Sequence, residues 1–197
     1  MKSVSISGSL RANVGTKDAK ALRRDNKIPC VLYGGAEQVH FTALEKEFKP
    51  LVYSPEVKLA ELSIDGRSFN AILKEVQYHP ISDKLLHVDF LEIVAGKPVT
   101  IEVPIKVVGN SPGIKAGGKL VQKFRKLKIR GSVENLPENI LVNIDSLEIG
   151  GSIRVKDITA ENLALLNLPN AVVLTIATTR NVATAATAEA AGAKKKK

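Results

Sequence analysis

The feature that most constrains this 197-residue chain is a succession of short segments in which apolar and polar residues alternate, separated by turn signals. Alternation at period two is typical of half-buried β-strands. The clearest case joins residues 57–64 and 67–76 through Asp65-Gly66, a dipeptide that favours the tight turn of a β-hairpin. A chain assembled from such pieces is expected to fold as a mostly β protein.

The first half of the chain contains several more short elements. Two helices are expected there. Thr16 can cap a helix that runs to about residue 26, and Thr42 with Glu45 fits a capping box, a pattern that begins many helices. Apolar patterns predict further strands over residues 3–10, 28–33 and 85–93.

A change of segment falls at residues 95–98, where Ala-Gly-Lys-Pro interrupts the strand patterns. Beyond it, residues 101–107 alternate cleanly, and Pro104 predicts an edge position for that strand because proline has no N–H to donate. A short helix is expected over residues 160–166. More strands are expected near residues 120–130, 140–144, 152–156 and 171–177.

Three parts are therefore expected along the chain. Residues 1–94 form a first domain and residues 95–179 a β-rich second domain. Residues 180–197 are rich in Ala, Thr and Lys and lack large apolar side chains, so this tail cannot bury a face and is expected to be disordered. The fold class is mostly β with a few short helices.

Positive charge is concentrated in three places. The chain has 29 Lys and Arg against 20 Asp and Glu, a formal net charge of +9. Residues 1–27 hold seven basic and two acidic residues, residues 115–130 hold seven basic residues and no acid, and the tail holds five basic residues and one acid. Such segregation indicates a polyanionic partner. Ordinary solvated surface charge is the alternative.

Composition argues against several classes of protein. No segment approaches the roughly 20 apolar residues that span a bilayer, and the N-terminus lacks the apolar stretch of a signal peptide. The single cysteine, Cys30, excludes internal disulfides and lies in an apolar run, so a buried structural thiol is expected. Aromatic residues make up 4%, too few for rows of rings that stack on single-stranded nucleic acid. We expect a soluble cytoplasmic protein with no membrane partner.

Patterns typical of catalysis are incomplete. Residues 113–119 match the spacing of a phosphate-binding loop, but Leu120 stands where Ser or Thr would hold magnesium. The three histidines, His40, His79 and His87, have no partners at metal-ligand spacing except Asp89 beside His87. We therefore expect no enzyme, no metal and no cofactor, and a small nucleotide-dependent enzyme is the weaker alternative.

Two groups of polar residues are more informative. The first begins at Arg11 and continues through a basic helix to Tyr33. The second lies on the strand over residues 85–93, where His87 and Asp89 point to one face while Val88 and Phe90 point to the other. Two polar groups at this spacing can make directional hydrogen bonds to nucleic acid. A merely solvated strand face is the alternative.

These residues resemble a known family, the bacterial large-subunit ribosomal protein twenty-five in its long form, also called general stress protein Ctc. The first motif is Leu-Arg-Arg at 22–24, Asn-Lys-Ile-Pro at 26–29 and Tyr-Gly-Gly at 33–35. The second is Gln-Tyr-His-Pro at 77–80 with Leu-His-Val-Asp-Phe at 86–90. Glycine and proline positions from 109 to 118 and Leu-Glu-Ile-Gly at 147–150 extend the resemblance to about 180 residues.

The resemblance implies an N-terminal β-barrel that binds 5S ribosomal RNA, a β-rich second domain, and a monomer bound to the large subunit of the cytoplasmic ribosome. Its RNA-contacting positions fall on Arg11, Arg23, Arg24, Tyr33, His87 and Asp89. Contacts are also plausible at the neighbouring Lys17, Lys20 and Gln77. Asp18 departs from the family, which often has a small residue there, and is expected to weaken the local positive potential slightly.

A second basic patch is expected in the second domain. Lys126, Lys128 and Arg130 alternate with apolar residues, so in a strand the three charges share one face. With Lys123 they are expected to contact other large-subunit RNA or ribosomal proteins. The favoured function is thus a structural component of the large ribosomal subunit, and a dissociable ribosome-associated stress factor is the alternative.

Overall fold

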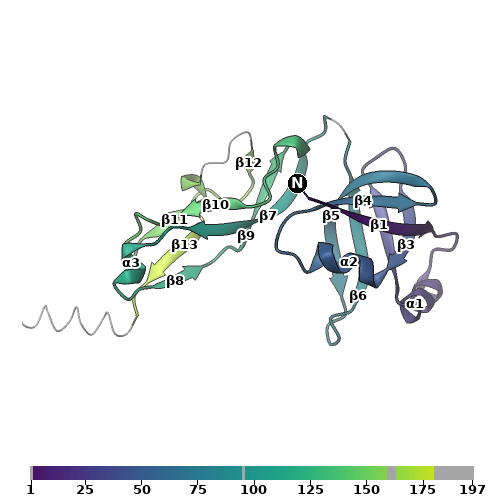
Figure 1. Cartoon of the computed structure of the whole chain (residues 1–197), viewed down its shortest axis with the longest axis horizontal. Helices are drawn as coiled ribbons and strands as arrows, with labels where there is room; N and C mark the ends of the chain where they lie inside the picture. Colours follow the sequence, from purple (N-terminus) through teal and green to yellow (C-terminus); the bar gives the residue numbers. More distant parts are fainter. Residues whose placement is uncertain (1, 95, 159–162, 180–197) are drawn as a thin grey trace, which may run out of the picture. The chain divides into compact units, whose positions relative to one another are not determined.

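The computed structural model describes residues 2–94, 96–158 and 163–179, and the chain divides into two compact units (Figure 1). The first unit consists of residues 1–101 with 131–138. The second consists of residues 102–130 and the described residues between 139 and 179. Within the described ranges, no helix has the length and hydropathy needed to cross a membrane.

The first unit is built on a closed barrel, which is the fold that the family resemblance implied. Its strands are joined in the order β1-β3-β2-β6-β5-β4. The pairs β1–β4 and β2–β6 are parallel, and the pairs β1–β3, β2–β3, β4–β5 and β5–β6 are antiparallel. The strands are β1 (Ser3–Leu10), β2 (Lys27–Tyr33), β3 (Val39–Leu44), β4 (Leu59–Ile64), β5 (Arg67–Tyr78) and β6 (Leu85–Glu92).

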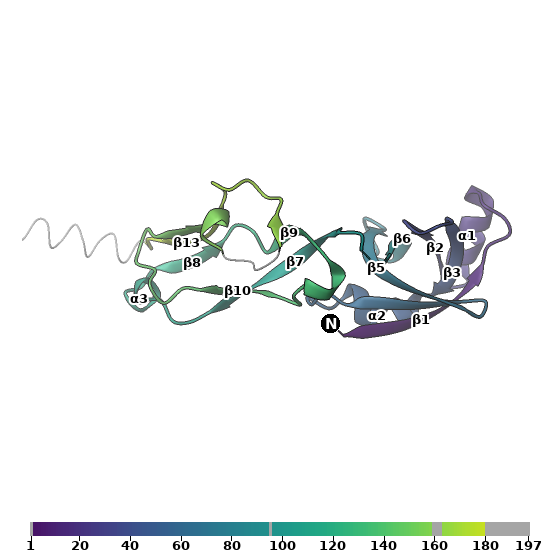
Figure 2. The ribbon, with the colours of Figure 1, turned by 90° about the horizontal axis from the view of Figure 1, so that it is seen from above.

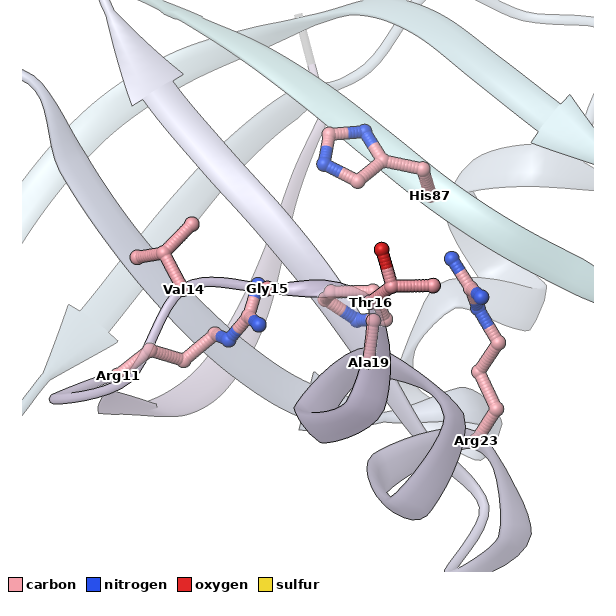
Figure 3. A pocket seen from close by; sticks show the side chains of 8 residues that line it. Arg11, Val14, Gly15, Thr16, Ala19, Arg23 and His87 are labelled. Carbon is pink, nitrogen blue, oxygen red and sulfur yellow. The ribbon is translucent and has the colours of Figure 1, made fainter.

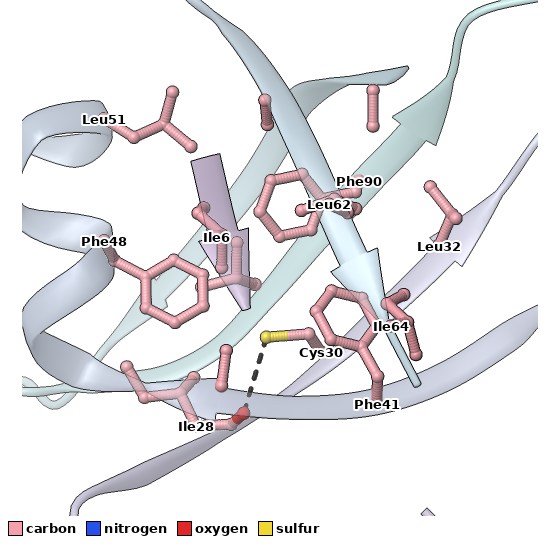
Figure 4. Packing of buried hydrophobic residues seen from close by; sticks show 14 of the residues in the cluster. Ile6, Ile28, Cys30, Leu32, Phe41, Phe48, Leu51, Leu62, Ile64 and Phe90 are labelled. Carbon is pink, nitrogen blue, oxygen red and sulfur yellow. Dashed lines mark hydrogen bonds between the residues drawn. The ribbon is translucent and has the colours of Figure 1, made fainter. Parts of the chain in front are cut away.

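Apolar side chains of alternate strand residues fill the barrel (Figure 4). The rings of Phe41 and Phe48 both lie against Phe90, with centroids 5.9 and 6.3 Å away. Cys30 is completely buried beside them, as expected, and its thiol donates to the Ile28 carbonyl at 3.4 Å. Burying each large apolar side chain contributes about 1.5–3 kcal/mol, so this core makes the barrel a firm support for its outer surface.

The predicted hairpin and both predicted helices are present, but neither helix begins as expected. Helix α1 (Thr16–Arg24) follows Gly15 and has no side-chain cap, so Thr16 is not the capping residue. Helix α2 (Glu45–Val52) directly follows β3. Thr42 lies inside β3 and exchanges a hydrogen bond with the Ser9 hydroxyl at 3.1 Å, so the predicted capping box is wrong. The Thr42 side chain therefore bonds across the barrel and does not cap α2, as the local pattern had predicted it would.

The second unit contains two small sheets with orders β10-β7-β9-β12 and β11-β13-β8. Figures 1 and 2 show β10 and β9 on either side of β7. The short helical turns of this unit include α3 (Pro112–Lys115) and η2 (Val155–Asp157), whereas η1 (Val133–Asn135) lies in the segment that belongs to the first unit. The strands are β7 (Val99–Val108), β8 (Lys119–Gln122), β9 (Lys126–Gly131), β10 (Ile140–Asn143), β11 (Ser152–Arg154), β12 (Ala164–Leu165) and β13 (Val172–Ala177).

Three expectations for this part of the chain need correction. Strand β7 has neighbours on both sides, so Pro104 does not mark an edge strand. The register of β7 with β10 begins one residue later, at Ile105, and the N–H of Ile105 donates to the Arg125 carbonyl at 2.9 Å. Residues 120–130 form two strands that belong to different sheets. Ala164 and Leu165 form β12 rather than a helix, because they pair with β9. The predicted disordered tail, residues 180–197, and the start of the predicted 160–166 helix lie outside the described residues.

Candidate nucleic-acid interface

An open pocket of about 340 Å³ lies where α1 begins (Figure 3). Three of the predicted RNA-contacting residues meet there, namely Arg11 after β1, Arg23 on α1 and His87 on β6. The sequence separates these residues by up to 76 positions, and the barrel brings them together. The pocket is lined by Arg11, Val14, Gly15, Thr16, Ala19, Arg23, Pro29 and His87.

Helix α1 divides its residues between the barrel and the solvent. Ala19 and Arg23 line the pocket and are half-buried. Lys17, Lys20 and Arg24 are exposed, and their spacing of three and four residues puts them on one face of the helix. The helix that was expected to be basic therefore has an exposed basic face, and its three cations are accessible to phosphate groups.

Arg11 is held by Asp18, a residue that was expected only to weaken the local positive potential. Its Nη2 and Nε donate to Asp18 Oδ2 at 2.6 and 3.2 Å. The Arg11 side chain is only 8% exposed. A guanidinium that is paired and buried to this degree contributes less to the positive surface potential than the exposed cations of α1. The contribution of Arg11 is therefore mainly to the shape of the pocket wall.

Arg23 is anchored in a different way. Its Nε donates to the backbone carbonyl of Leu86, the residue before His87, at 3.0 Å. Figure 3 shows its side chain extending from α1 toward His87. A guanidinium has five N–H donors, and this bond uses one of them. Arg23 is therefore fixed in place with its charge next to the pocket.

His87 and Asp89 share one face of β6, as predicted. His87 Nδ1 lies 2.6 Å from Asp89 Oδ1, and the two side chains are 28% and 25% exposed. Val88 and Phe90, which alternate with them, are completely buried. The carboxylate orients the imidazole through Nδ1, so the other ring nitrogen, Nε2, is available to a ligand.

Strand pairing extends this polar face onto β5, whereas on β2 the residue opposite Asp89 is the buried Val31. Gln77 pairs with His87, Glu75 pairs with Asp89, and Val31 pairs with Asp89 on the other side. Directly paired residues point to the same face of a sheet. The predicted contact residues Gln77, His87 and Asp89 are therefore neighbours on the outer surface of the barrel.

Tyr33 lies two residues after Val31 and belongs to the same face. Burial raises the pKa of its hydroxyl, and the charges of Asp89 and Glu75 raise the pKa further. Tyr33 is thus a neutral phenol at physiological pH and can donate a hydrogen bond. The following Gly34 has a φ of 97°, and a Cβ there would lie 2.6 Å from Leu91 Cδ1. The first glycine of the Tyr-Gly-Gly motif is therefore favoured by both its backbone conformation and its close packing.

The outer surface thus has two chemically different regions. The exposed face of α1 is cationic, whereas Asp89 and Glu75 make the β5–β6 region rich in acceptors. Carboxylates repel phosphates but accept hydrogen bonds from base amino groups and 2′-hydroxyls. Glu75 is not among the predicted contact residues, although its spacing of two residues from Gln77 in a strand was a usable signal.

The glycine-rich segment that imitates a phosphate-binding loop has its backbone donors engaged within the protein. The N–H of Gly113 donates to the Ser111 hydroxyl at 3.0 Å and the Leu147 carbonyl at 3.1 Å, and the N–H of Gly118 donates to the Gly113 carbonyl at 2.9 Å. These groups cannot also cradle a phosphate. In the described ranges, no three His, Cys, Asp or Glu residues are grouped to hold a metal ion.

The predicted second basic patch is divided by the structure. Lys126, Lys128 and Arg130 are exposed on β9, and the alternating Leu127 and Ile129 are completely buried. Lys123 follows β8, and its N–H donates to Val173 of β13 at 2.9 Å, in the other sheet of this unit. The three β9 cations therefore form one surface, and Lys123 is attached to the other sheet.

Curated relatives cover nearly all of the chain. A protein of Azobacteroides pseudotrichonymphae named large ribosomal subunit protein bL25 is 44% identical over 181 residues, which are 91% of this chain and 96% of the relative. A protein of the same name from Bacteroides fragilis is 42% identical over 193 residues, 95% of this chain and 98% of the relative. Another, from Amoebophilus asiaticus, is 41% identical over the full length of both chains.

Family models match both parts of the chain. One is described as the Ribosomal L25p family and matches residues 6–90, and the other is described as the C-terminal domain of ribosomal protein TL5 and matches residues 98–180. The barrel with its basic helix, followed by a second β unit, is thus the layout of a two-domain ribosomal protein. The chain belongs to the ribosomal L25p family, and the resemblance found in its motifs is confirmed.

Proposed function

We propose that this protein is a structural component of the large ribosomal subunit, bound to the ribosome in the cytoplasm, and that its first unit binds 5S ribosomal RNA. Family membership and the names of the relatives support the large-subunit assignment. They also point to a component that is not an enzyme. The choice of 5S RNA follows from the family resemblance and from the chemistry of the barrel surface.

The observation that carries the proposal is the adjacency of two kinds of group around the α1 pocket. Lys17, Lys20 and Arg24 form an exposed cationic face that can neutralise phosphates. Around the pocket and on β6, Arg23 and the bonded pair of His87 and Asp89 are held in fixed orientations. A folded RNA offers both partners, because its minor groove displays 2′-hydroxyls and base edges between the phosphate strands.

The division of labour follows from this geometry. The α1 cations supply affinity that depends on salt, since each phosphate contact releases counterions. His87, Asp89 and Tyr33 supply directional bonds that set the register of the RNA. Arg11 acts as a positioning residue, because its guanidinium is largely buried and bonded to Asp18.

A dissociable stress factor that binds the same RNA is the second candidate function. It differs from a permanent component in how firmly it is held. Co-sedimentation with large subunits in high salt separates the two. Retention through repeated high-salt washes supports the structural component, and release under those washes supports the dissociable factor.

A footprint on total ribosomal RNA tests the assignment of the partner. The purified chain is mixed with deproteinised large-subunit RNA, and backbone cleavage is mapped with and without the protein. Protection is expected on 5S RNA, and Arg24→Ala should weaken it. Protection confined to other RNA would show that the proposed partner is wrong.

A further inference from the structure

The outer face of the sheet β10-β7-β9 in the second unit is rich in exposed positive charge, and this charge is not part of the candidate 5S interface. Lys126, Lys128 and Arg130 are exposed on β9, and Lys106 is exposed on the adjacent β7. We call these four residues the cationic sheet face. All four belong to the second unit, whereas the candidate 5S interface lies on the first.

The fold fixes these cations in position. Leu127 and Ile129 on β9 and Val103 on β7 are completely buried, so the strands cannot turn their charged sides inward without exposing the core. Alternate residues of a strand lie about 6.7 Å apart, so β9 presents a row of three evenly spaced charges. A row of this kind suits a linear series of negative charges better than a single anion.

Very little acid opposes this charge. The four strands of the sheet contain one acidic residue, Glu102, whose Oε1 lies 3.7 Å from Lys128 Nζ. The two side chains are 53% and 61% exposed, and exposed pairs of this length contribute little to stability. Lys128 can therefore exchange Glu102 for another anion at small cost.

The exposed residues beside these cations, on β10 and at the end of β7, are apolar rather than acidic. Leu141 on β10 pairs with Lys106 and is 67% exposed, and Val108 pairs with Asn143 and is 45% exposed. The four strands contain no aromatic side chain that could stack on a base. The face thus offers cations and small apolar groups, which fit a sugar–phosphate backbone, and it lacks the groups that read base sequence.

We propose that the cationic sheet face binds the backbone of a second ribosomal RNA segment, outside 5S RNA, without sequence specificity. This inference rests on the proposed ribosomal function. It gives the second unit a role of its own, which is to hold the protein on the subunit at a second point. The combined contact would be tighter than that of either unit alone, since the second contact forms at high effective concentration.

Charge reversal tests the contact on the full chain. The test variant is Lys126→Glu/Lys128→Glu/Arg130→Glu. The control variant is Lys119→Glu/Arg154→Glu/Lys156→Glu, which makes the same charge change at exposed positions outside the cationic sheet face. Equal thermal unfolding of both variants and the wild type establishes that each is folded.

Two measurements on these variants separate this inference from the proposed function. Affinity for isolated 5S RNA should be unchanged in both variants. Retention on large subunits depleted of the protein should fall in the test variant, with a salt slope lower by about two to three, since three phosphate contacts are lost. Retention equal to the control across the titration would overturn the inference, whereas no 5S binding by the wild type would overturn the proposed function instead.

A directed probe identifies the partner. Because Cys30 is completely buried, Lys128→Cys provides one accessible thiol among the described residues for an iron chelate that cleaves nearby RNA. Cleavage is expected in large-subunit RNA outside 5S RNA. Cleavage in 5S RNA alone would contradict the proposal. So would the absence of RNA cleavage because the probe lies next to a ribosomal protein.

Discussion

The carboxylate of Asp18, in the first turn of α1, accepts two hydrogen bonds from the guanidinium of Arg11, at 2.6 and 3.2 Å. This pair ties the segment after β1 to the helix that carries the exposed cations. Asp18 therefore holds Arg11 where it lines the pocket, and the two bonded charges are engaged with each other rather than with a phosphate. Their contribution to RNA binding should be geometric.

Asp18→Ala should lower the free energy of unfolding by about 1 kcal/mol, because it leaves the largely buried guanidinium of Arg11 without its partner. It should weaken 5S RNA binding without lowering the salt slope, since no cation is removed. Chemical denaturation and RNA titration at several salt concentrations measure both. A stronger affinity for RNA together with unchanged stability would mean that Asp18 only opposes the positive potential.

Arg24→Ala and Asp89→Ala should separate phosphate contacts from positioning contacts. Arg24 is an exposed cation, so its removal should weaken binding and lower the salt slope by about 0.7–0.9. Asp89 cannot neutralise a phosphate, so its removal should weaken binding at an unchanged slope. Equal slope changes in the two variants would contradict this division of roles.

His87 and Asp89 should behave as one unit in RNA binding. Because Asp89 orients the imidazole at 2.6 Å, removing either residue should abolish most of what the pair contributes. The loss in His87→Ala/Asp89→Ala should therefore be smaller than the sum of the two single losses, with a coupling energy of about 0.5–3 kcal/mol. Gln77→Ala, on the neighbouring strand, provides a comparison. Strict additivity of the His87 and Asp89 losses would show that the two residues act independently.

Cys30 should resist thiol reagents while the barrel is folded. Burial raises the pKa of the thiol above its ordinary value of 9.0, so the reactive thiolate is disfavoured in the native state. Labelling at pH 8 should be slow in buffer and rapid in denaturant. The folded state keeps the thiol protonated above pH 9.0, where the unfolded chain ionises, so native stability should begin to fall as pH rises past that value. Rapid labelling in buffer would mean that the barrel opens locally around β2.

Much of the first unit could be predicted because its signals are local. Alternating residues with fixed turns determine β4 and β5, and Asp65 and Gly66 have the positive φ angles, 45° and 85°, that such a turn requires. Two of the wrong predictions concern residues whose partners are distant in sequence. Thr42 bonds across the barrel to Ser9, and β12 exists only because β9 pairs with it. No local pattern contains that information.

The candidate site shows the same limit. Residue types and motifs indicated Arg23, His87 and Asp89, but the order of the strands around the barrel is what places α1 beside β6. The sequence did not predict that Asp18 would hold Arg11 or that Glu75 would lie next to Asp89. Both contacts join separate elements, and the second depends on a β5–β6 register that shifts between Leu73 and Glu75.

A competition experiment tests whether the first unit recognises 5S RNA as a folded shape. The purified full chain is bound to labelled 5S RNA at moderate salt, and unlabelled 5S RNA or transfer RNA is added as competitor. Transfer RNA has the same kind of phosphate backbone as 5S RNA but a different folded shape. We expect 5S RNA to compete at least about tenfold better, a difference of about 1.4 kcal/mol, and this preference to be lost in His87→Ala/Asp89→Ala. Equal competition by the two RNAs would contradict it.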